Sequence, residues 1–188
     1  AFHSEGKGRD IEMANVGDDV SVGRSKGGLV GRRGLTGAAF TAKVLGAASE
    51  KGDDVQKIAH LGRTMVKNFV TVGSSLDHCH VPGRSTDPKE RGALSQSAVE
   101  IGMGIHNEPG AKHIENKPSG EDLIKEMLEL LLREDDPERS FVKFNKDDDP
   151  VLIINNLGGM STIELGAIAA EARTQIERDW NLRLSRVY

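Results

Sequence analysis

The sequence predicts an α/β fold, because segments with helical periodicity alternate with short aliphatic runs that are typical of strands. Helix-capping residues and glycines mark where most of the expected helices begin and end. An aromatic content of 4%, together with 22 glycines, fits a loop-rich α/β protein better than an aromatic-rich β-sandwich. The alternation by itself leaves α+β open as the second class.

The first part of the chain is predicted to hold a strand and two helices. The strand is IEMANV (11–16), and a long glycine-rich connection follows it. An alanine-rich helix begins near Thr36 and ends at Gly52, because glycine tolerates the backbone conformation that closes many helices. Asp53 or Asp54 is the expected N-cap of the second helix. The apolar face of that helix consists of Val55, Ile58, Ala59, Gly62, Met65, Val66 and Phe69.

The second part continues the alternation. Extended segments are predicted at 70–82, 99–105, 141–144, 151–155 and 182–187. Among them VLIIN (151–155) is a continuous aliphatic run, typical of a strand covered on both faces. Ser119 with Asp122, and Ser161 with Glu164, have the spacing of capping boxes, so a helix is expected to begin at each serine.

Charge and cysteine content exclude several classes of protein. The chain of 188 residues carries 25 basic and 29 acidic side chains, a net charge of −4, so nothing global attracts nucleic acid or an anionic membrane. No apolar run approaches the roughly 20 residues that span a bilayer. Cys79 is the single cysteine, which rules out an intrachain disulfide and favours a reducing, cytoplasmic compartment.

GRRG (31–34) is a basic loop between glycines that leads into a helix. Backbone N–H groups and two guanidinium groups could bind a phosphate there. The segment lacks the Walker-type lysine followed by Ser or Thr, because Leu35 and Thr36 come next. The sequence favours the alternative, a turn whose arginines are solvated or pair with Asp18 and Asp19.

HCH (78–80) and NNLGG (155–159) are weaker candidates. HCH places two imidazoles on one face of an extended segment, but two histidines are too few for a zinc site. Nothing nearby marks Cys79 as a nucleophile, so a structural histidine pair near a turn is favoured. NNLGG could bind a ligand at a strand end, although its glycines favour a tight strand-to-helix turn.

His106, in EIGMGIHNEPG (100–110), is the strongest candidate residue. Gly102 and Gly104 remove side chains from one face, which would leave room for a small ligand. Glu108 could orient the imidazole ring. A neutral imidazole can act as a base, a metal ligand or a nucleophile, and its unperturbed pKa of about 6.5 leaves it mostly neutral at cytosolic pH. A hydrogen-bonded structural histidine is the alternative.

GRRGLTG, TVGSSLDHCHVPG, EIGMGIHNEPG and INNLGG, in this order, resemble the K domain of dihydroxyacetone (glycerone) kinases. The resemblance covers nearly the whole chain, and GMGIHNEPG is its most specific part. HCHVPGR is similar to the fungal, single-chain, ATP-dependent branch rather than to the bacterial multi-subunit branch. The resemblance implies part of the first α/β subdomain of a K domain, residues 1–70, joined to most of the second subdomain, residues 71–188.

The resemblance also implies a role for His106, as catalytic and substrate-binding residue without a metal. In the family the matching histidine forms a covalent hemiaminal with the carbonyl carbon of dihydroxyacetone. Glycerol has no electrophilic carbon, so this bond separates the two molecules chemically. Capture would hold the hydroxymethyl group for phosphoryl transfer, giving dihydroxyacetone phosphate. Whether glyceraldehyde is also a substrate stays open.

Other parts of such a kinase are not matched here. A glycine-rich loop carrying a histidine and an acid–base pair are expected upstream, and the helical L domain that binds ATP and Mg²⁺ downstream or on a separate subunit. We therefore expect a segment of a longer cytoplasmic kinase, inactive by itself and joined in a homodimer, as is common in the family. The alternative is a K-like module that senses a triose without phosphoryl transfer.

Overall fold

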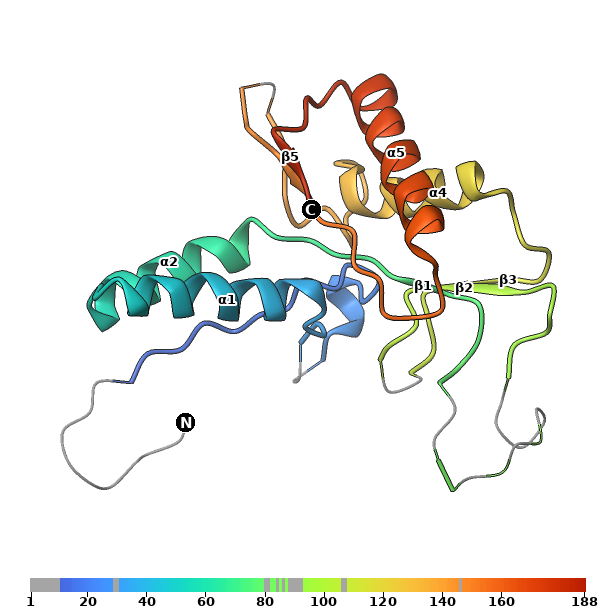
Figure 1. The fold of residues 1–188 in the computed structure, drawn as a ribbon, viewed down its shortest axis with the longest axis horizontal. Helices are drawn as coiled ribbons and strands as arrows, with labels where there is room; N and C mark the ends of the chain where they lie inside the picture. The colour runs from blue at the N-terminus through green and yellow to red at the C-terminus, as the bar shows by residue number, and fades with distance from the viewer. Residues whose placement is uncertain are drawn as a thin grey trace.

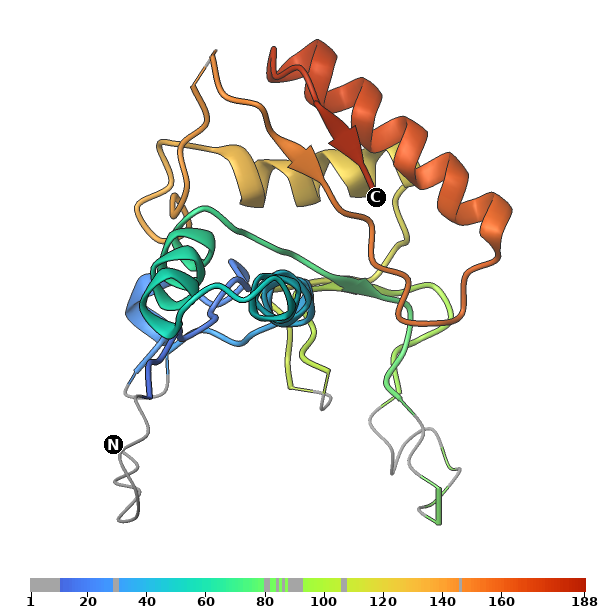
Figure 2. The same ribbon diagram turned by 60° about the vertical axis from the view of Figure 1, so that its left-hand side comes forward.

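The computed structural model describes residues 11–28, 31–79, 82–83, 85, 87, 93–105, 108–145 and 147–188. Its described residues form two pairs of helices and two small sheets, arranged as Figures 1 and 2 show. One sheet is antiparallel and the other parallel. The predicted mixture of helices and strands is thereby confirmed.

Helices α1 (Thr36–Glu50) and α2 (Val55–Lys67) lie side by side at one end of the molecule (Figure 1). Helix α2 begins as predicted, because the carboxylate of Asp54 accepts the backbone N–H of Lys57 at 2.9 Å. After α1 the chain turns at Gly52, whose φ of +84° confirms the expected glycine ending. Both helix boundaries thus follow from local chemistry.

The three-stranded sheet has the order β1-β2-β3, with β1 at Ser74–Ser75, β2 at Val99–Ile101 and β3 at Lys112–Ile114. Strand β2 is buried along its whole length. Its Ile101 packs with Val20 and Val72 in one hydrophobic core. The sheet therefore places the end of β2, and the loop after it, against the segment around residue 20.

Helix α4 (Gly120–Leu132) lies over this sheet, and α5 (Thr162–Asp179) lies against α4 on the side away from it (Figure 2). Helix α4 uses two apolar faces: Leu123 and Met127 contact the core that contains Ile101 of β2, whereas Ile124 and Leu128 contact α5. Both helices begin as predicted: Ser119 caps α4 by accepting the Asp122 N–H, and Ser161 with Glu164 forms a complete capping box at α5.

Strands β4 (Val151–Leu152) and β5 (Arg186–Val187) form the parallel two-stranded sheet. Leu152 of β4 and Leu184, two residues before β5, pack against α4 and α5. Strand formation at the start of VLIIN and near residue 187 confirms two predictions. The expectation that VLIIN is covered on both faces is wrong for this structure, because Val151 is 46% exposed.

Two predicted strands do not form. Residues 11–16 run beside α2, where Glu12 binds the side chains of Gln56 and Arg63. A helix has already used its backbone groups and offers no ladder to a strand, which explains the failure. In FVKF (141–144), Phe141 packs against the core and its ring meets arginine side chains, without strand pairing.

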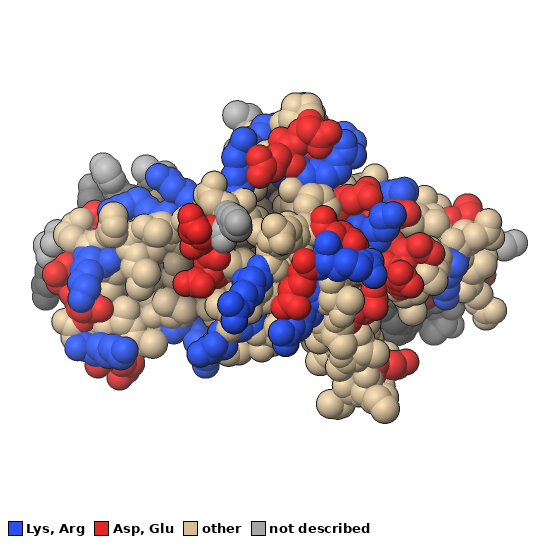
Figure 3. Space-filling view, turned by 90° about the horizontal axis from the view of Figure 1, so that it is seen from above, with Lys and Arg blue, Asp and Glu red and all other residues tan. Residues whose placement is uncertain are grey.

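The surface shows no dominant sign of charge on the face seen from above, where acidic and basic groups intermingle (Figure 3). This mixture agrees with the small net charge of −4. Among the described helices, none combines the length and apolar character that a bilayer crossing demands.

Candidate functional site

The β2–β3 loop, residues 102–111, contains most of the segment EIGMGIHNEPG (100–110), in which the sequence places the strongest candidate residue. His106 lies outside the described residues. On either side of that position the loop is held by backbone hydrogen bonds: Gly104 N–H donates to the Glu108 carbonyl at 3.0 Å, and Ala111 N–H to the Ile101 carbonyl at 2.9 Å. The chain on both sides of His106 therefore has a defined place at the end of the sheet.

Gly102 is required for packing, and side-chain ends fill the space beside Gly104. Gly102 has a φ of +82°, and a Cβ atom added there would collide with Ser21. A Cβ atom added at Gly104 would collide with the carboxylate of Glu108 and the guanidinium of Arg33. The interpretation that these glycines leave room for a ligand is wrong for these faces, because protein side chains fill the space.

Arg33 joins this loop to the segment before it. Its Nε donates to Asp19 Oδ2 at 2.8 Å, and its Nη2 donates both to Ser21 Oγ at 2.8 Å and to the Gly102 carbonyl at 2.7 Å. Ser21 Oγ in turn donates to Asp19 Oδ1 at 2.5 Å. The Asp19 side chain is fully buried and that of Arg33 is 22% exposed, so solvent screens this ion pair little.

Asp18 has a different task. Its carboxylate accepts the backbone N–H of Leu35 and that of Gly37, both at 2.9 Å, and so caps helix α1 from a distant part of the chain. The phosphate hypothesis for GRRG is wrong at this helix start, because Asp18 occupies these N–H groups and Asp19 holds Arg33. Pairing of the arginines with the nearby acids, the favoured alternative, is confirmed for Arg33.

Arg32 points to another neighbour, Phe141. Its guanidinium carbon lies 3.3 Å from the centroid of the ring, and that of Arg24 lies 4.3 Å from the same centroid. Burial lowers the pKa of Arg32, and the charge of Arg24 lowers it further. Arg32 thus anchors the segment beside Arg33 by stacking.

The far end of the β2–β3 loop is held by Glu100. This residue is buried, and its carboxylate accepts the backbone N–H of Gly110. His113, on β3, places Nδ1 3.9 Å from Glu100 Oε2. The loop is consequently fixed at both ends, by Arg33 at Gly102 and by Glu100 at Gly110.

The segment HCH (78–80) is described only in part. In HCH, the backbone N–H of His78 donates to Asp77 Oδ1 at 2.8 Å, Cys79 is exposed, and His80 lies outside the described residues. The described part of the chain holds no group of three or more side chains suited to a metal ion.

NNLGG forms the tight turn that the sequence favours. Gly158 N–H donates to Asn156 Oδ1 at 2.9 Å, and Gly158 and Gly159 both have positive φ. Asn156 Nδ2 also donates to the Met160 carbonyl at 3.0 Å. The side chain of Asn156 therefore stabilises the turn that precedes α5.

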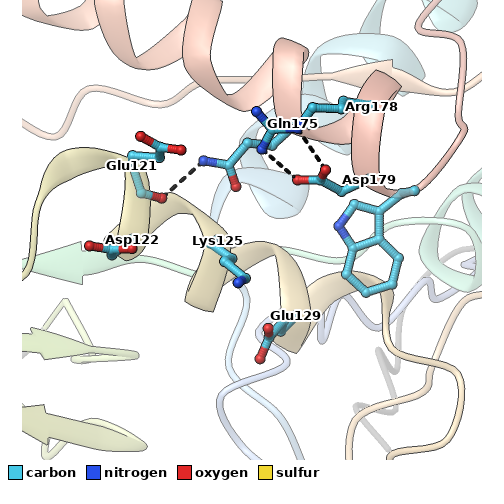
Figure 4. Close-up of a pocket in the computed structure, with 8 residues that line it drawn as sticks. Glu121, Asp122, Lys125, Glu129, Gln175, Arg178 and Asp179 are labelled. Atoms are coloured by element: carbon cyan, nitrogen blue, oxygen red, sulfur yellow. Dashed lines mark hydrogen bonds and ion pairs between the residues drawn. The ribbon is translucent and has the colours of Figure 1, made fainter.

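A pocket of about 360 Å³ lies elsewhere, between α4 and α5 (Figure 4). In it Gln175 Nε2 donates to the Glu121 carbonyl at 2.9 Å, and Arg178 forms two hydrogen bonds to Asp179, at 2.7 and 2.8 Å. Its lining is formed by Glu121, Asp122, Lys125, Glu129, Gln175, Arg178, Asp179 and Trp180. Within this lining Arg178 and Asp179 thus satisfy each other's charge.

Sequence reasoning missed Ser21 and the link from Arg33 to Gly102. The signal that could have found them is the acidic pair of GDDV, which lies in an apolar context and is followed by the basic pair of GRRG. Buried acids require donors, and the two guanidinium groups of GRRG are strong donors a short distance along the chain.

The Dak1 domain matches residues 1–188. The chain is 45% identical over 176 residues to "Dihydroxyacetone kinase 2" of Saccharomyces cerevisiae, covering 94% of this chain and 29% of the relative. It is 39% identical over 198 residues to "Dihydroxyacetone kinase" of Pichia angusta, covering 100% and 32%.

Among solved structures, the dihydroxyacetone kinase of C. freundii in complex with AMP-PNP and Mg²⁺ is similar with a TM-score of 0.70 and 24% identity. The match covers 92% of this chain and 28% of that one, and it shows a shared fold. The chain spans about a third of the length of the curated relatives it matches.

Proposed function

The chain belongs to the Dak1 domain family, and we propose that it is a substrate-binding part of an ATP-dependent kinase that phosphorylates dihydroxyacetone. Relatives named as dihydroxyacetone kinases match at least 93% of this chain at 39–45% identity. The observation that carries the proposal is the β2–β3 loop, fixed on both sides of His106 by Arg33 and Glu100. Covalent capture of a small substrate needs such a fixed frame.

In the proposed chemistry His106 is the nucleophile. The lone pair of its unprotonated ring nitrogen forms a bond to the carbonyl carbon of dihydroxyacetone, and the C=O π pair moves to oxygen. The oxygen gains a proton and the other ring nitrogen loses one, which gives a neutral hemiaminal. Glycerol has no electrophilic carbon and would not be captured, so specificity arises from bond formation.

ATP supplies the phosphoryl group in this proposal, and Mg²⁺ accompanies it. We assign both to another part of the protein, an L domain, as the resemblance to the kinase family implies. The C. freundii kinase, which shares this fold, is in complex with AMP-PNP and Mg²⁺, a pair of the same chemical class. The task of this chain is to present the substrate's hydroxymethyl group for transfer.

The remaining expectations belong to the same proposal. We assign residues 1–70 to the end of a first K subdomain and residues 71–188 to most of a second. We further propose a cytoplasmic homodimer; a chain whose single cysteine is Cys79 fits a reducing compartment. Glyceraldehyde, which also has a carbonyl group, is a testable second substrate.

The test is ¹³C NMR of the full-length protein with [2-¹³C]dihydroxyacetone. The proposal predicts a protein-bound tetrahedral carbon signal that is absent with His106→Ala, while His113→Ala, on the neighbouring strand, retains it. Glycerol should not displace the signal. An adduct of undiminished intensity on His106→Ala would contradict the role of this histidine.

A triose-sensing module without phosphoryl transfer is the alternative that the sequence leaves open, and the kinase names of the relatives do not favour it. Turnover measurements separate the two functions. The kinase predicts ATP-dependent formation of dihydroxyacetone phosphate by the full-length protein, whereas a sensor would form the adduct and leave ATP unconsumed.

A further inference from the structure

We propose that Arg33, held by Asp19, is a positioning residue that sets the place of the β2–β3 loop for covalent capture. This inference rests on the proposed function of His106. It assigns a role to an arginine that lies 69 residues before the backbone group it binds and that belongs to a different segment of the fold. The one guanidinium group links the loop to the segment that begins at Asp18.

The guanidinium of Arg33 contacts several groups at once. Nε binds Asp19, and Nη2 reaches both Ser21 Oγ and the Gly102 carbonyl, while Nη1 lies against the face of Gly104. A planar fork with five donors can hold all these groups in one orientation. A lysine carries the same charge on a single point and cannot bind Asp19 and Gly102 in this geometry.

These contacts fix the first residue of the loop. Gly102 begins the loop at φ +82°, and its N–H donates to the Gly73 carbonyl at 2.7 Å. Its carbonyl is the acceptor for Arg33, and Ser21 Oγ lies 3.3 Å from the same oxygen. Both backbone groups of Gly102 are therefore committed, so the direction in which the loop leaves β2 is defined.

Covalent capture depends on the precision with which the loop is placed. Formation of a covalent bond requires the reacting atoms to approach within a narrow range of distance and angle, and a shift of about 1 Å can cost about a hundredfold in rate. Glu100 holds the far end of the loop through Gly110, a contact that does not involve Arg33. Loss of the Arg33 fork should therefore displace the near end of the loop while the sheet stays intact.

The experiment compares Arg33→Lys with Arg173→Lys in the full-length protein. Arg173 pairs with Glu177 at 2.9 Å on the exposed side of α5, so it controls for the same chemical change outside the loop. The measured quantities are the Kd of the [2-¹³C]dihydroxyacetone adduct, the KM values for dihydroxyacetone and ATP, and the thermal unfolding midpoint.

We expect Arg33→Lys to weaken the adduct by about tenfold or more and to raise the KM for dihydroxyacetone, with the KM for ATP unchanged. Arg173→Lys should match the parent protein. An adduct Kd within about twofold of the parent for Arg33→Lys overturns the positioning role, whether or not the unfolding midpoint falls.

Ser21→Ala is the second variant, because it removes one contact of the fork and keeps the ion pair. If Arg33→Lys does not fold, Ser21→Ala decides: an adduct weakened by about threefold supports the proposal, and an unchanged one overturns it. His106→Ala separates this outcome from failure of the proposed function. If His106→Ala keeps the adduct, the proposed function is wrong. If His106→Ala loses the adduct while Arg33→Lys and Ser21→Ala keep it, only the positioning role of Arg33 is wrong.

Discussion

Two arginine–aspartate pairs in this molecule have nearly equal lengths and opposite settings. Arg33 Nε lies 2.8 Å from Asp19, with side chains 22% and 0% exposed; Arg178 Nε lies 2.7 Å from Asp179, with side chains 55% and 39% exposed. The hydrogen bonds from Arg178 lower the pKa of Asp179. Solvent screens the second pair, whereas the first also binds Ser21 and a backbone carbonyl.

The difference between the two pairs bears on our proposal that the functional site lies at the β2–β3 loop. The second pair lines the open pocket between α4 and α5, where Arg178 and Asp179 satisfy each other's charge (Figure 4). The first pair lies under a loop whose glycines are packed against side chains. Buried polar groups that converge on one loop indicate an organised site more strongly than the size of a hollow does.

The largest predicted effect comes from removing the buried acid. Asp19→Asn should lower the free energy of unfolding by about 3 kcal/mol, because it leaves the partly buried Arg33 without its counter-charge. Chemical denaturation measures this loss. Asp179→Asn, in the exposed pair, should leave the unfolding midpoint unchanged, and equal losses for the two variants would contradict the contrast drawn between the pairs.

Gly102 and Gly159 allow a similar comparison of a packed and an open position in the backbone. Gly102→Ala and Gly159→Ala place a methyl group at similar φ values, +82° and +78°. At Gly159 an added Cβ meets no described atom within 4 Å, so we expect about 1 kcal/mol of backbone strain alone. At Gly102 the collision with Ser21 should raise the loss to about 2–3 kcal/mol. Denaturant midpoints of both variants give the difference, and similar values would show that Ser21 yields freely.

Helix caps provide a milder form of the same contrast. The buried Asp18 caps α1 from a distant segment, whereas the exposed Ser161 caps α5 locally. Asp18→Ala should cost about 2 kcal/mol, because two backbone N–H groups lose their acceptor. Ser161→Ala should cost about 1 kcal/mol. Thermal unfolding of the two variants tests the order, which the reverse ranking would contradict.

The smallest effect concerns Glu138, whose pKa is lowered by hydrogen bonds from Ser25, first from its backbone N–H and then from its hydroxyl. A carboxyl with a lowered pKa in the folded state stabilises the fold above its ordinary pKa and loses that contribution as pH falls through the folded value. Between about pH 5 and pH 3, the unfolding midpoint should therefore fall more steeply in the parent protein than in Glu138→Gln. Parallel curves would contradict a role for this contact.

Local parts of the fold could be predicted from sequence and remote parts could not. The caps at Asp54, Ser119 and Ser161 were predictable, because an N-cap satisfies N–H groups only two or three residues away. Strands of two or three residues depend on partners far along the chain, and the segment 11–16 shows that apolar alternation fails when a helix is the neighbour.

In the candidate site, too, some contacts could be predicted from the sequence and others could not. The sequence favours pairing of the GRRG arginines with Asp18 and Asp19, because both motifs are visible in it. Arg33 does pair with Asp19. The contact from Arg33 to Gly102 crosses 69 residues and ends on a backbone carbonyl, which carries no sequence signature. The sequence predicts room for a ligand beside Gly102 and Gly104, and only packing shows that Ser21, Arg33 and Glu108 fill this space.

A crystal structure of the full-length protein soaked with dihydroxyacetone would show whether His106 is the covalent ligand of the substrate. We expect a covalent bond from a ring nitrogen of His106 to a tetrahedral carbon of the substrate, with Arg33 still bound to the Gly102 carbonyl. A substrate found as an unmodified planar ketone, or bound in the pocket between α4 and α5 with His106 unmodified, would contradict it.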